Sequence, residues 1–366
     1  MVSPNEWIKD TAIYQPGKPL EEVKRELGLT EVIKMASNEN PWGCSKEVWS
    51  KGVSHPEDTP FYPEGAAPDL TEKIAEHIET DPSRILLGNG TDEIVKMLAQ
   101  VYLKPGKNAI MADFTFPRYE MVTKMTGADI VKVPLSDGCH DLKEMENRIN
   151  ADTQIVWICN PNNPTGTIVD RVTIESFLER IPPHVLVVMD EAYQEYVTHP
   201  DYPDTIALID YNPQVIALRT FSKIYGLASF RIGYAVAHPS VIQMLNRVRD
   251  PFNTNRYAQS AALHALTDQT FVLYCRNQNR LGMKQITSQL EKWDLSYYPS
   301  QANFILIHTG FAGDDVFNHL LRAGIIVRSG QVLGYPTSIR VTIGTKEQNE
   351  LFLQAFAAFL KEKGKI

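Results

Sequence analysis

The sequence predicts an α/β protein with a large domain built on a mainly parallel sheet, followed by a smaller α+β domain. Three observations predict this fold. The chain has 366 residues, of which 43% are hydrophobic, enough for two domains with sizeable cores. Between about residues 84 and 240, short apolar runs alternate with longer amphipathic stretches, as strands and helices do in α/β proteins. After about residue 250 this alternation stops, so a different kind of domain is expected there.

Six apolar runs are expected to form strands of the large sheet. Each is continuously hydrophobic rather than alternating, which is typical of a sheet covered on both faces. Between the first two runs, Thr91-Asp92-Glu93 begins a helical pattern that extends to Tyr102. The six runs are Arg84–Leu87, Ala109–Ala112, Ile155–Cys159, Val185–Met189, Val215–Leu218 and Ile232–Val236.

The carboxyl-terminal part is predicted to begin with one long helical stretch, roughly residues 255–292. Strands are expected at 303–307, 324–328 and 339–343, with a terminal amphipathic helix. Proline and glycine breaks near the amino terminus indicate an arm that packs on this smaller domain. The expected division is an amino-terminal arm at 1–35, a large domain at 36–250 and a small domain at 251–366.

Composition excludes several classes of protein. Lys and Arg number 36 against 44 Asp and Glu, a net charge of −8 with no basic block, which argues against binding to nucleic acid or an anionic membrane. No secretory leader and no apolar run of about 18 residues is visible, so a soluble, cytoplasmic protein is expected. Neither a disulfide framework nor a metal site is expected, because the cysteines are far apart: Cys44, Cys139, Cys159 and Cys275.

Four polar clusters follow predicted strands. In a parallel sheet, ligands bind at the carboxyl ends of the strands, so these clusters are candidates for one site. They are Gly88–Asp92, Asn160–Gly166, Asp190–Tyr193 and Arg219–Lys223, the last with Arg231 nearby.

Each cluster also has a structural interpretation, and that of Asn160–Gly166 is a plain rigid turn. Gly88–Asp92 at a helix start suits an anion, but it could be an ordinary capped turn, and it lacks the third glycine of a dinucleotide site. Asp190 could form a structural salt bridge, and any lysine is most often a surface residue. A desolvated Lys223 among hydroxyls, however, could be a nucleophile. Together the clusters indicate a phosphate, an aldehyde for Lys223 and a basic nitrogen for Asp190, which pyridoxal phosphate combines.

At these residues the chain resembles the fold-type I pyridoxal-phosphate aminotransferases, and among them the histidinol-phosphate aminotransferase family. The resemblance implies that family's seven-stranded, mainly parallel sheet. One departure lies just beyond Tyr62, where Leu70-Thr71 stands in place of the family's frequent Leu-Arg. Besides the four clusters, the resemblance rests on Tyr14–Pro19, Ser37–Pro41, Tyr62–Gly65, Pro251–Asn253 and Arg340–Gly344.

The resemblance implies catalytic roles for residues of the last two clusters. Lys223 would form the internal aldimine with pyridoxal 5'-phosphate and then act as general acid and base. Asp190 would keep the pyridine nitrogen protonated. Tyr193 and Asn163 would hydrogen-bond the ring hydroxyl, and Phe116 would stack on the ring.

The resemblance also implies an anion-binding set and a substrate set. Tyr62 would reach the cofactor phosphate from a second subunit, which makes a homodimer part of the active site. Arg340 would bind the carboxylate of glutamate and, with Arg328 and Tyr14, the phosphate of histidinol phosphate; Asn40 would be a further substrate residue. The remaining cofactor contacts would be Gly90, Thr91, Asp92, Thr220, Ser222 and Arg231.

The function implied is transamination between L-histidinol phosphate and 2-oxoglutarate by a ping-pong mechanism in L-histidine biosynthesis, giving imidazole acetol phosphate and L-glutamate. An aromatic amino-acid aminotransferase, or an enzyme with both activities, is the nearest alternative, because an apolar pocket separates similar flat rings poorly. A decarboxylase of a phosphorylated amino acid is another. A non-catalytic regulator and a nicotinamide dehydrogenase are disfavoured, because Lys223 keeps its supporting residues and the glycine fingerprint is missing.

Overall fold

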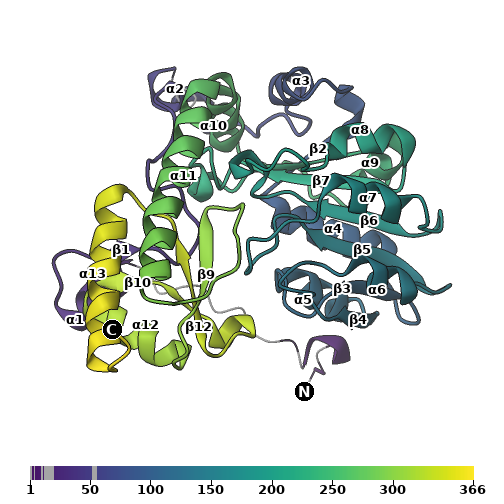
Figure 1. Ribbon diagram of the computed structural model, residues 1–366. Helices are drawn as coiled ribbons and strands as arrows, with labels where there is room; N and C mark the ends of the chain where they lie inside the picture. Colours follow the sequence, from purple (N-terminus) through teal and green to yellow (C-terminus); the bar gives the residue numbers. More distant parts are fainter. Residues whose placement is uncertain (1, 4, 10, 12–19, 52–55) are drawn as a thin grey trace.

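A seven-stranded sheet forms the centre of the larger part of the computed structural model (Figure 1). The structure describes all residues except 1, 4, 10, 12–19 and 52–55. The strand order is β2-β8-β7-β6-β5-β3-β4, and only β8 runs against the other six. The predicted mainly parallel sheet is therefore confirmed. The strands are β2 (Ile85–Gly88), β3 (Asn108–Ala112), β4 (Asp129–Val133), β5 (Thr153–Cys159), β6 (Leu186–Asp190), β7 (Val215–Thr220) and β8 (Gly233–Ala237).

All six apolar runs form strands of this sheet, but hydrophobicity alone did not reveal β4. This strand is at the edge of the sheet, and its residues Asp129 and Lys132 are exposed. An edge strand that faces solvent carries polar residues, so it lacks the continuous apolar signal of the inner strands.

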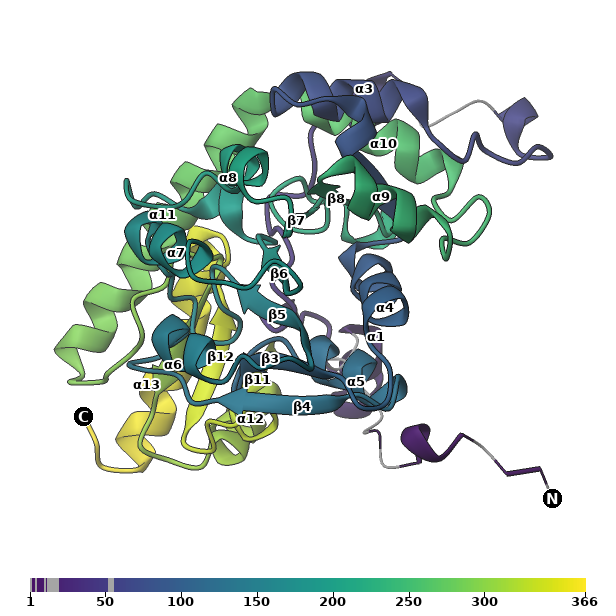
Figure 2. The ribbon, with the colours of Figure 1, turned by 90° about the vertical axis from the view of Figure 1, so that its right-hand side faces the viewer.

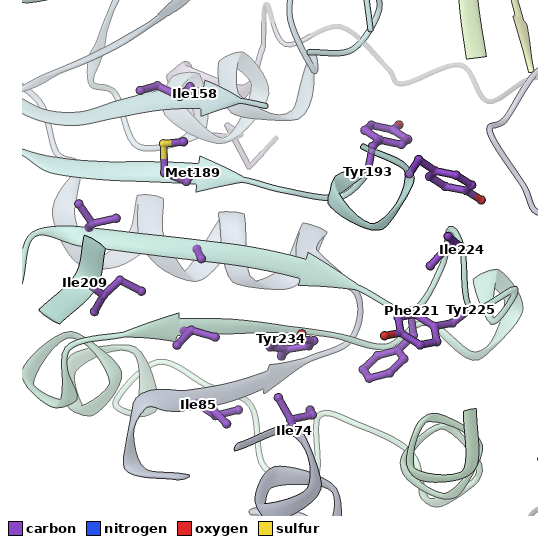
Figure 3. Packing of buried hydrophobic residues seen from close by; sticks show 14 of the residues in the cluster. Ile74, Ile85, Ile158, Met189, Tyr193, Ile209, Phe221, Ile224, Tyr225 and Tyr234 are labelled. Carbon is purple, nitrogen blue, oxygen red and sulfur yellow. The ribbon is translucent and has the colours of Figure 1, made fainter. Parts of the chain in front are cut away.

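Helices cover both faces of the sheet, as Figure 2 shows. Because neighbouring residues of a strand point to opposite faces, Ile110 packs in one hydrophobic cluster while Ala109 and Met111 pack in the other. The first cluster, drawn in part in Figure 3, includes side chains of α3 (Pro68–His77), α6 (Leu142–Asn147), α7 (Arg171–Leu178), α8 (Thr205–Tyr211) and α10 (Arg256–Thr267). The second includes side chains of α4 (Thr91–Tyr102), α5 (Arg118–Met125) and α9 (Pro239–Asn246).

The smaller part has its own sheet and core. Its antiparallel strands are ordered β11 (Arg328–Ser329), β12 (Ser338–Thr342) and β9 (Phe304–His308). Helices α12 (Gly313–Arg322) and α13 (Lys346–Glu362) supply apolar residues to a third cluster. Helix α11 (Gln269–Lys292) joins both parts, because Val272 packs in the first cluster and Ile286 in the third. The division of the chain at residues 35 and 250 stays a prediction.

Two elements differ from the predicted ones. The stretch 255–292 is not one helix: Asp268 interrupts it and caps α11, accepting hydrogen bonds from the Phe271 N–H at 3.0 Å and the Ser45 hydroxyl at 2.5 Å. The expected strand at 324–328 is divided between two sheets. Its first half is β10 (Ile325–Ile326), which pairs with β1 (Ile33–Lys34), and β11 pairs with β12.

The amino-terminal segment contacts the smaller part. In helix α1 (Leu20–Leu27), the fully buried Val23 clusters with Leu321 and Ile326. The remaining elements are short: helix α2 (Glu47–Ser50) and the 3₁₀ turns Glu6–Ile8, Pro56–Asp58, Pro82–Arg84, Gln194–Tyr196, Ala228–Phe230 and Gln331–Leu333.

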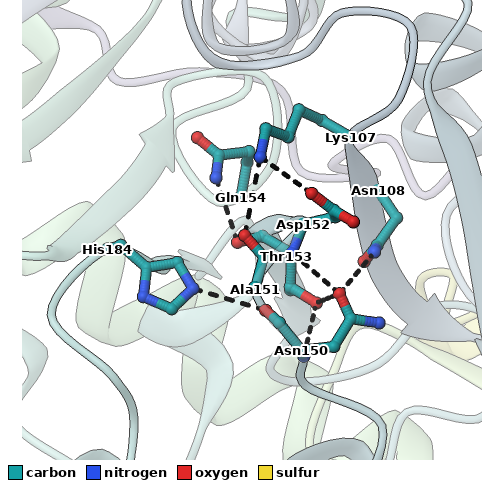
Figure 4. Close-up of polar contacts among 8 residues, drawn as sticks. All are labelled: Lys107, Asn108, Asn150, Ala151, Asp152, Thr153, Gln154 and His184. Carbon is teal, nitrogen blue, oxygen red and sulfur yellow. Dashed lines mark hydrogen bonds and ion pairs between the residues drawn. The ribbon is translucent and has the colours of Figure 1, made fainter.

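A polar network joins the amino ends of β3 and β5 (Figure 4). Lys107 bonds the carboxylate of Asp152 at 2.9 Å, and the Asn108 amide bonds the Asn150 side chain at 3.2 Å. The register between these strands shifts at Asn108, so side-chain bonds support the pairing there. This network is at the opposite ends of the strands from the polar clusters.

Candidate active site

A cavity of about 100 Å³ lies where β5, β6 and β7 end and α4 begins. The polar clusters therefore meet, as the parallel sheet predicted. Ten of the predicted site residues line the cavity, together with Cys159 and Ala192. The ten are Thr91, Asp92, Phe116, Asn163, Asp190, Tyr193, Thr220, Ser222, Lys223 and Arg231.

Lys223 follows strand β7 and extends toward the smaller part. Its ammonium nitrogen lies 3.4 Å from the carbonyl oxygen of Ser37 and 5.6 Å from the centre of the Tyr193 ring. Burial, followed by the positive charge of Arg340, lowers the pKa of Lys223 to about 8. The side chain is therefore no ordinary surface lysine, and a substantial fraction of it is a neutral amine near physiological pH.

Asp190 is the last residue of β6, and its side chain is only 4% exposed. One oxygen accepts a hydrogen bond from the Tyr119 hydroxyl at 2.6 Å, and the other accepts one from the Ala192 N–H at 3.2 Å. Burial raises the pKa of Asp190 to about 6. The ion pair considered for this cluster is formed by the neighbouring Glu191, which meets Arg219 at 3.0 Å.

The amino terminus of α4 and Arg231 form the end of the site suited to an anion. Gly90, with φ +73°, precedes the helix, whose first N–H groups have no partner within the helix. Arg231 lies so close that a Cβ atom on Gly90 would be 2.6 Å from its Nη2. The same guanidinium lies 3.3 Å from the Ser222 hydroxyl and 3.4 Å from the Asp92 carboxylate.

Two predicted residues are held by partners from distant parts of the chain. The Asn38 amide donates to the Tyr193 hydroxyl at 3.0 Å, and burial raises the pKa of Tyr193. Arg340, on β12, donates to the Asn163 side chain at 2.5 Å and to the Ala36 carbonyl at 2.7 Å. The smaller part thus places a guanidinium beside the cavity formed by the larger part.

Arg328 and Arg340 lie directly opposite one another in the β11–β12 pair. Side chains of directly paired residues lie on the same face of a sheet, so the two guanidinium groups share a face. Arg328 does not line the cavity itself, although Arg340 contacts the cavity residue Asn163.

Two further predicted residues, Asn40 and Tyr62, do not line the cavity. Asn40 donates its amide to the carbonyl oxygen of Ile224, next to Lys223, at 2.7 Å. Tyr62 is 78% exposed and stacks on Phe252 with ring centres 4.5 Å apart. Tyr14 lies outside the described residues.

Four residues around the site were not among the predicted ones. Cys159 and Ala192 line the cavity; Cys159 directly precedes the second cluster and Ala192 lies within the third, and these positions could have indicated them. Asn38 belongs to a motif in which only Asn40 was assigned a role. Tyr119 lies within an amphipathic helix pattern, and no local signal distinguishes it from an ordinary core residue.

A larger cavity, about 1120 Å³, lies between α3, α8 and α11 and includes Glu195, Arg219 and Arg276 in its lining. Apart from Arg219 of the fourth cluster, it contains no residue of the four clusters and none to which a site role was given, so size alone does not identify the site. Within the part of the chain that the structure describes, no three His, Cys, Asp or Glu side chains are placed to hold a metal ion. No helix formed by those residues has the length and apolar character needed to span a membrane.

Comparison with known proteins identifies the family. Aminotransferase class I and II matches residues 30–356. A histidinol-phosphate aminotransferase of Geobacillus sp. (strain WCH70) is 50% identical over 350 residues, 96% of each chain. The histidinol-phosphate aminotransferase of Sinorhizobium meliloti, solved in complex with pyridoxal-5'-phosphate, superposes with a TM-score of 0.91 at 25% identity over 99% of each chain.

A decarboxylase shares the fold alone. The L-threonine-O-3-phosphate decarboxylase of Porphyromonas gingivalis has a TM-score of 0.79 at 23% identity, over 90% of this chain and 100% of its own. Fold similarity therefore does not separate the two reactions, whereas the 50% identity over 96% of the chain does distinguish the families. The chain belongs to the class I and II aminotransferases and, among them, to the histidinol-phosphate aminotransferase family.

Proposed function

We propose that this protein transfers an amino group between L-histidinol phosphate and 2-oxoglutarate, with pyridoxal 5'-phosphate held in the cavity. One observation supports the chemistry above all others. A lysine with a pKa of about 8, a buried carboxylate and an anion-binding helix terminus line the same small cavity. An aldehyde, a ring nitrogen and a phosphate on one molecule match these three features.

The donor set around Arg231 fits a phosphate group. The guanidinium, the hydroxyls of Thr220 and Ser222 and the start of α4 can all donate hydrogen bonds to an anion. Gly90 leaves space for this arrangement, since a Cβ there would meet the guanidinium. The Asp92 carboxylate beside Arg231 is 44% exposed, so solvent screens its repulsion of an anion.

The polar side chains then have separate tasks. Bound pyridoxal phosphate supplies an aldehyde carbon and a ring that can take up an electron pair. Lys223 would provide the neutral amine and would be the base that moves the proton at the substrate Cα. Asp190 holds a proton at the ring nitrogen. Tyr193, fixed by Asn38, and Asn163, fixed by Arg340, offer hydrogen bonds to the ring hydroxyl.

The arginines opposite one another on β11 and β12 support an anionic substrate. Arg340 would bind the carboxylate of glutamate, and Arg340 with Arg328 would bind the phosphate of histidinol phosphate, since a guanidinium suits both anions through paired hydrogen bonds. Tyr14 and Asn40 remain proposed substrate residues.

The enzyme is further proposed to act as a homodimer in the cytoplasm. Tyr62 is 78% exposed and is not part of the cavity lining, so a role at the cofactor phosphate requires a second copy of the chain. Four free cysteines and a net charge of −8 are consistent with a reducing compartment and with partners that are small molecules.

The proposed substrate is tested by kcat/KM for L-histidinol phosphate, L-tyrosine and L-phenylalanine, each with 2-oxoglutarate. A preference of about 100-fold for histidinol phosphate, about 2.7 kcal/mol, is expected. Equal values would indicate a dual-specificity enzyme, and activity on the aromatic substrates alone would contradict the proposal. Release of carbon dioxide without a need for 2-oxoglutarate would indicate a decarboxylase.

Arg328→Ala tests the phosphate contact. We expect kcat/KM for histidinol phosphate to fall about 10- to 100-fold, while the value for phenylalanine, which has no phosphate, changes about twofold at most. Arg322→Ala, which removes an exposed arginine of α12, is the matched control and should alter neither value. Equal losses for both substrates would remove Arg328 from the phosphate site.

A further inference from the structure

Tyr119 is a buried residue next to the cavity with no role in the proposed mechanism so far. It lies on α5 and is 0% exposed. Its hydroxyl donates a hydrogen bond of 2.6 Å to one oxygen of Asp190, and the Ala192 N–H donates to the other oxygen at 3.2 Å. Each oxygen of the carboxylate thus has one donor from the protein, which defines the orientation of the group.

Aromatic contacts fix the Tyr119 ring. It stacks on Trp157 of β5 with ring centres 4.9 Å apart and an interplanar angle of 7°. Phe116 meets it edge-on, with centres 5.6 Å apart and an angle of 80°. Because Trp157 is itself 0% exposed, the hydroxyl of Tyr119 has little freedom to leave Asp190. The same ring supports Phe116, the residue proposed to stack on the cofactor.

The contact between Tyr119 and Asp190 favours the charged form of the carboxyl group. Burial opposes that form and raises the pKa of Asp190, whereas the hydrogen bond from Tyr119 lowers it. Burial also raises the pKa of Tyr119, so its hydroxyl stays protonated and remains a donor. Hydrogen bonds to a charged acceptor are stronger than those between neutral groups, and the bond from Tyr119 to Asp190 is short at 2.6 Å.

We propose that Tyr119 is a positioning residue that holds Asp190 ionised and oriented toward the pyridine nitrogen of the cofactor. The inference rests on the proposed cofactor site. Tyr119 acts through Asp190 and, by supporting Phe116, through the residue on the face of the ring. No contact between Tyr119 and the cofactor is required.

Tyr119→Phe tests this role because it removes the hydroxyl and keeps the ring stack. In holoenzyme containing cofactor labelled with nitrogen-15 at the ring, we expect the nitrogen resonance to move toward that of an unprotonated pyridine. We also expect apoenzyme to bind pyridoxal phosphate about tenfold more weakly, the equivalent of about 1.4 kcal/mol. Tyr234→Phe, at a tyrosine of β8 that is 4% exposed, is the matched control and should change neither measurement.

A double-mutant cycle with Asp190→Asn shows whether the effect passes through Asp190. Tyr119→Phe should weaken cofactor binding about tenfold when it is made in the parent enzyme. When it is made in the Asp190→Asn variant, the loss should be less than about twofold. Equal losses in both backgrounds, or an unchanged nitrogen resonance in Tyr119→Phe, would overturn the role of Tyr119 alone. If Asp190→Asn itself changes neither resonance nor affinity, the proposed cofactor site is wrong and the inference falls with it.

Discussion

Lys223 illustrates how the surroundings of a single side chain shift its pKa. Desolvation penalises its positive charge, and the nearby guanidinium of Arg340 adds repulsion, so its pKa falls to about 8. The residue types in the 219–223 cluster predicted a desolvated lysine. The contribution of Arg340 could not be predicted, because it comes from a strand 117 residues further along the chain (340 − 223).

Capture of pyridoxal phosphate by the apoenzyme should therefore depend on pH. Only the neutral amine attacks an aldehyde, so the rate is expected to rise with pH around a midpoint of about 8. Stopped-flow measurement of the visible absorbance reports this midpoint, and a value near that of an ordinary lysine would contradict the assigned environment. Lys223→Ala should show no such absorbance, and borohydride reduction of the parent holoenzyme should label Lys223. Labelling of another lysine would place the cofactor elsewhere.

At the scale of elements, the start of α4 depends on the positive φ angle of Gly90 and on the side chain of Arg231 beside it. Gly90 has φ +73°, and its missing side chain leaves space for Arg231. Strand β2 and helix α4 meet here, so the position of the helix terminus follows from the packing of both elements on the sheet.

Gly90→Ala should weaken pyridoxal phosphate binding by about tenfold, because the new methyl group would displace the guanidinium of Arg231. Gly106→Ala is the matched control: this glycine also has a positive φ, +81°, but a Cβ there would meet no atom within 4 Å. Both variants should lose about 1 kcal/mol of stability through backbone strain. Titration of apoenzyme with cofactor and urea unfolding separate the two effects; equal affinities would show that Gly90 matters only for the backbone.

Elements with a strong hydrophobic signal in their own sequence could be predicted, and those defined by contacts could not. The inner strands are buried on both faces, so their sequences are continuously apolar. Edge strand β4 has polar residues facing solvent, and Asp268, at the break between α10 and α11, is bonded by Ser45 more than 200 residues away.

At the scale of the whole molecule, the site needs parts of the chain that sequence order separates. Asn38 reaches Tyr193 across 155 residues, and Arg340 reaches Asn163 across 177. The clusters at the strand ends could be predicted because a parallel sheet brings such ends together. Which side chains from distant parts of the chain would fix them depends on tertiary packing, and this packing cannot be inferred from local sequence.

Exposed aromatic side chains near Tyr62 support the proposed dimer. Phe61 and Tyr62 are each more than 60% exposed, and Phe252, itself 46% exposed, stacks on Tyr62. Large aromatic groups are enriched at protein interfaces, so a second copy of this chain is the expected partner for this surface.

Mixing two inactive variants tests whether Tyr62 acts across the dimer. After denaturation and refolding together, Lys223→Ala and Tyr62→Ala chains should form hybrids with one intact site, restoring about a quarter of the parent activity for random pairing. Each variant refolded alone is the control. If Tyr62 served its own subunit, every site in the mixture would carry one defect and activity would not recover.

The facing arginines of β11 and β12 also affect how this enzyme should be assayed. Two positive groups on one face attract any small dianion, and inorganic phosphate or sulfate in the buffer would compete with the substrate for them. An apparent KM for histidinol phosphate obtained in phosphate buffer would then exceed the one obtained in a zwitterionic buffer of equal ionic strength. Sulfate in a crystallisation solution would likewise compete with the substrate for these two arginines.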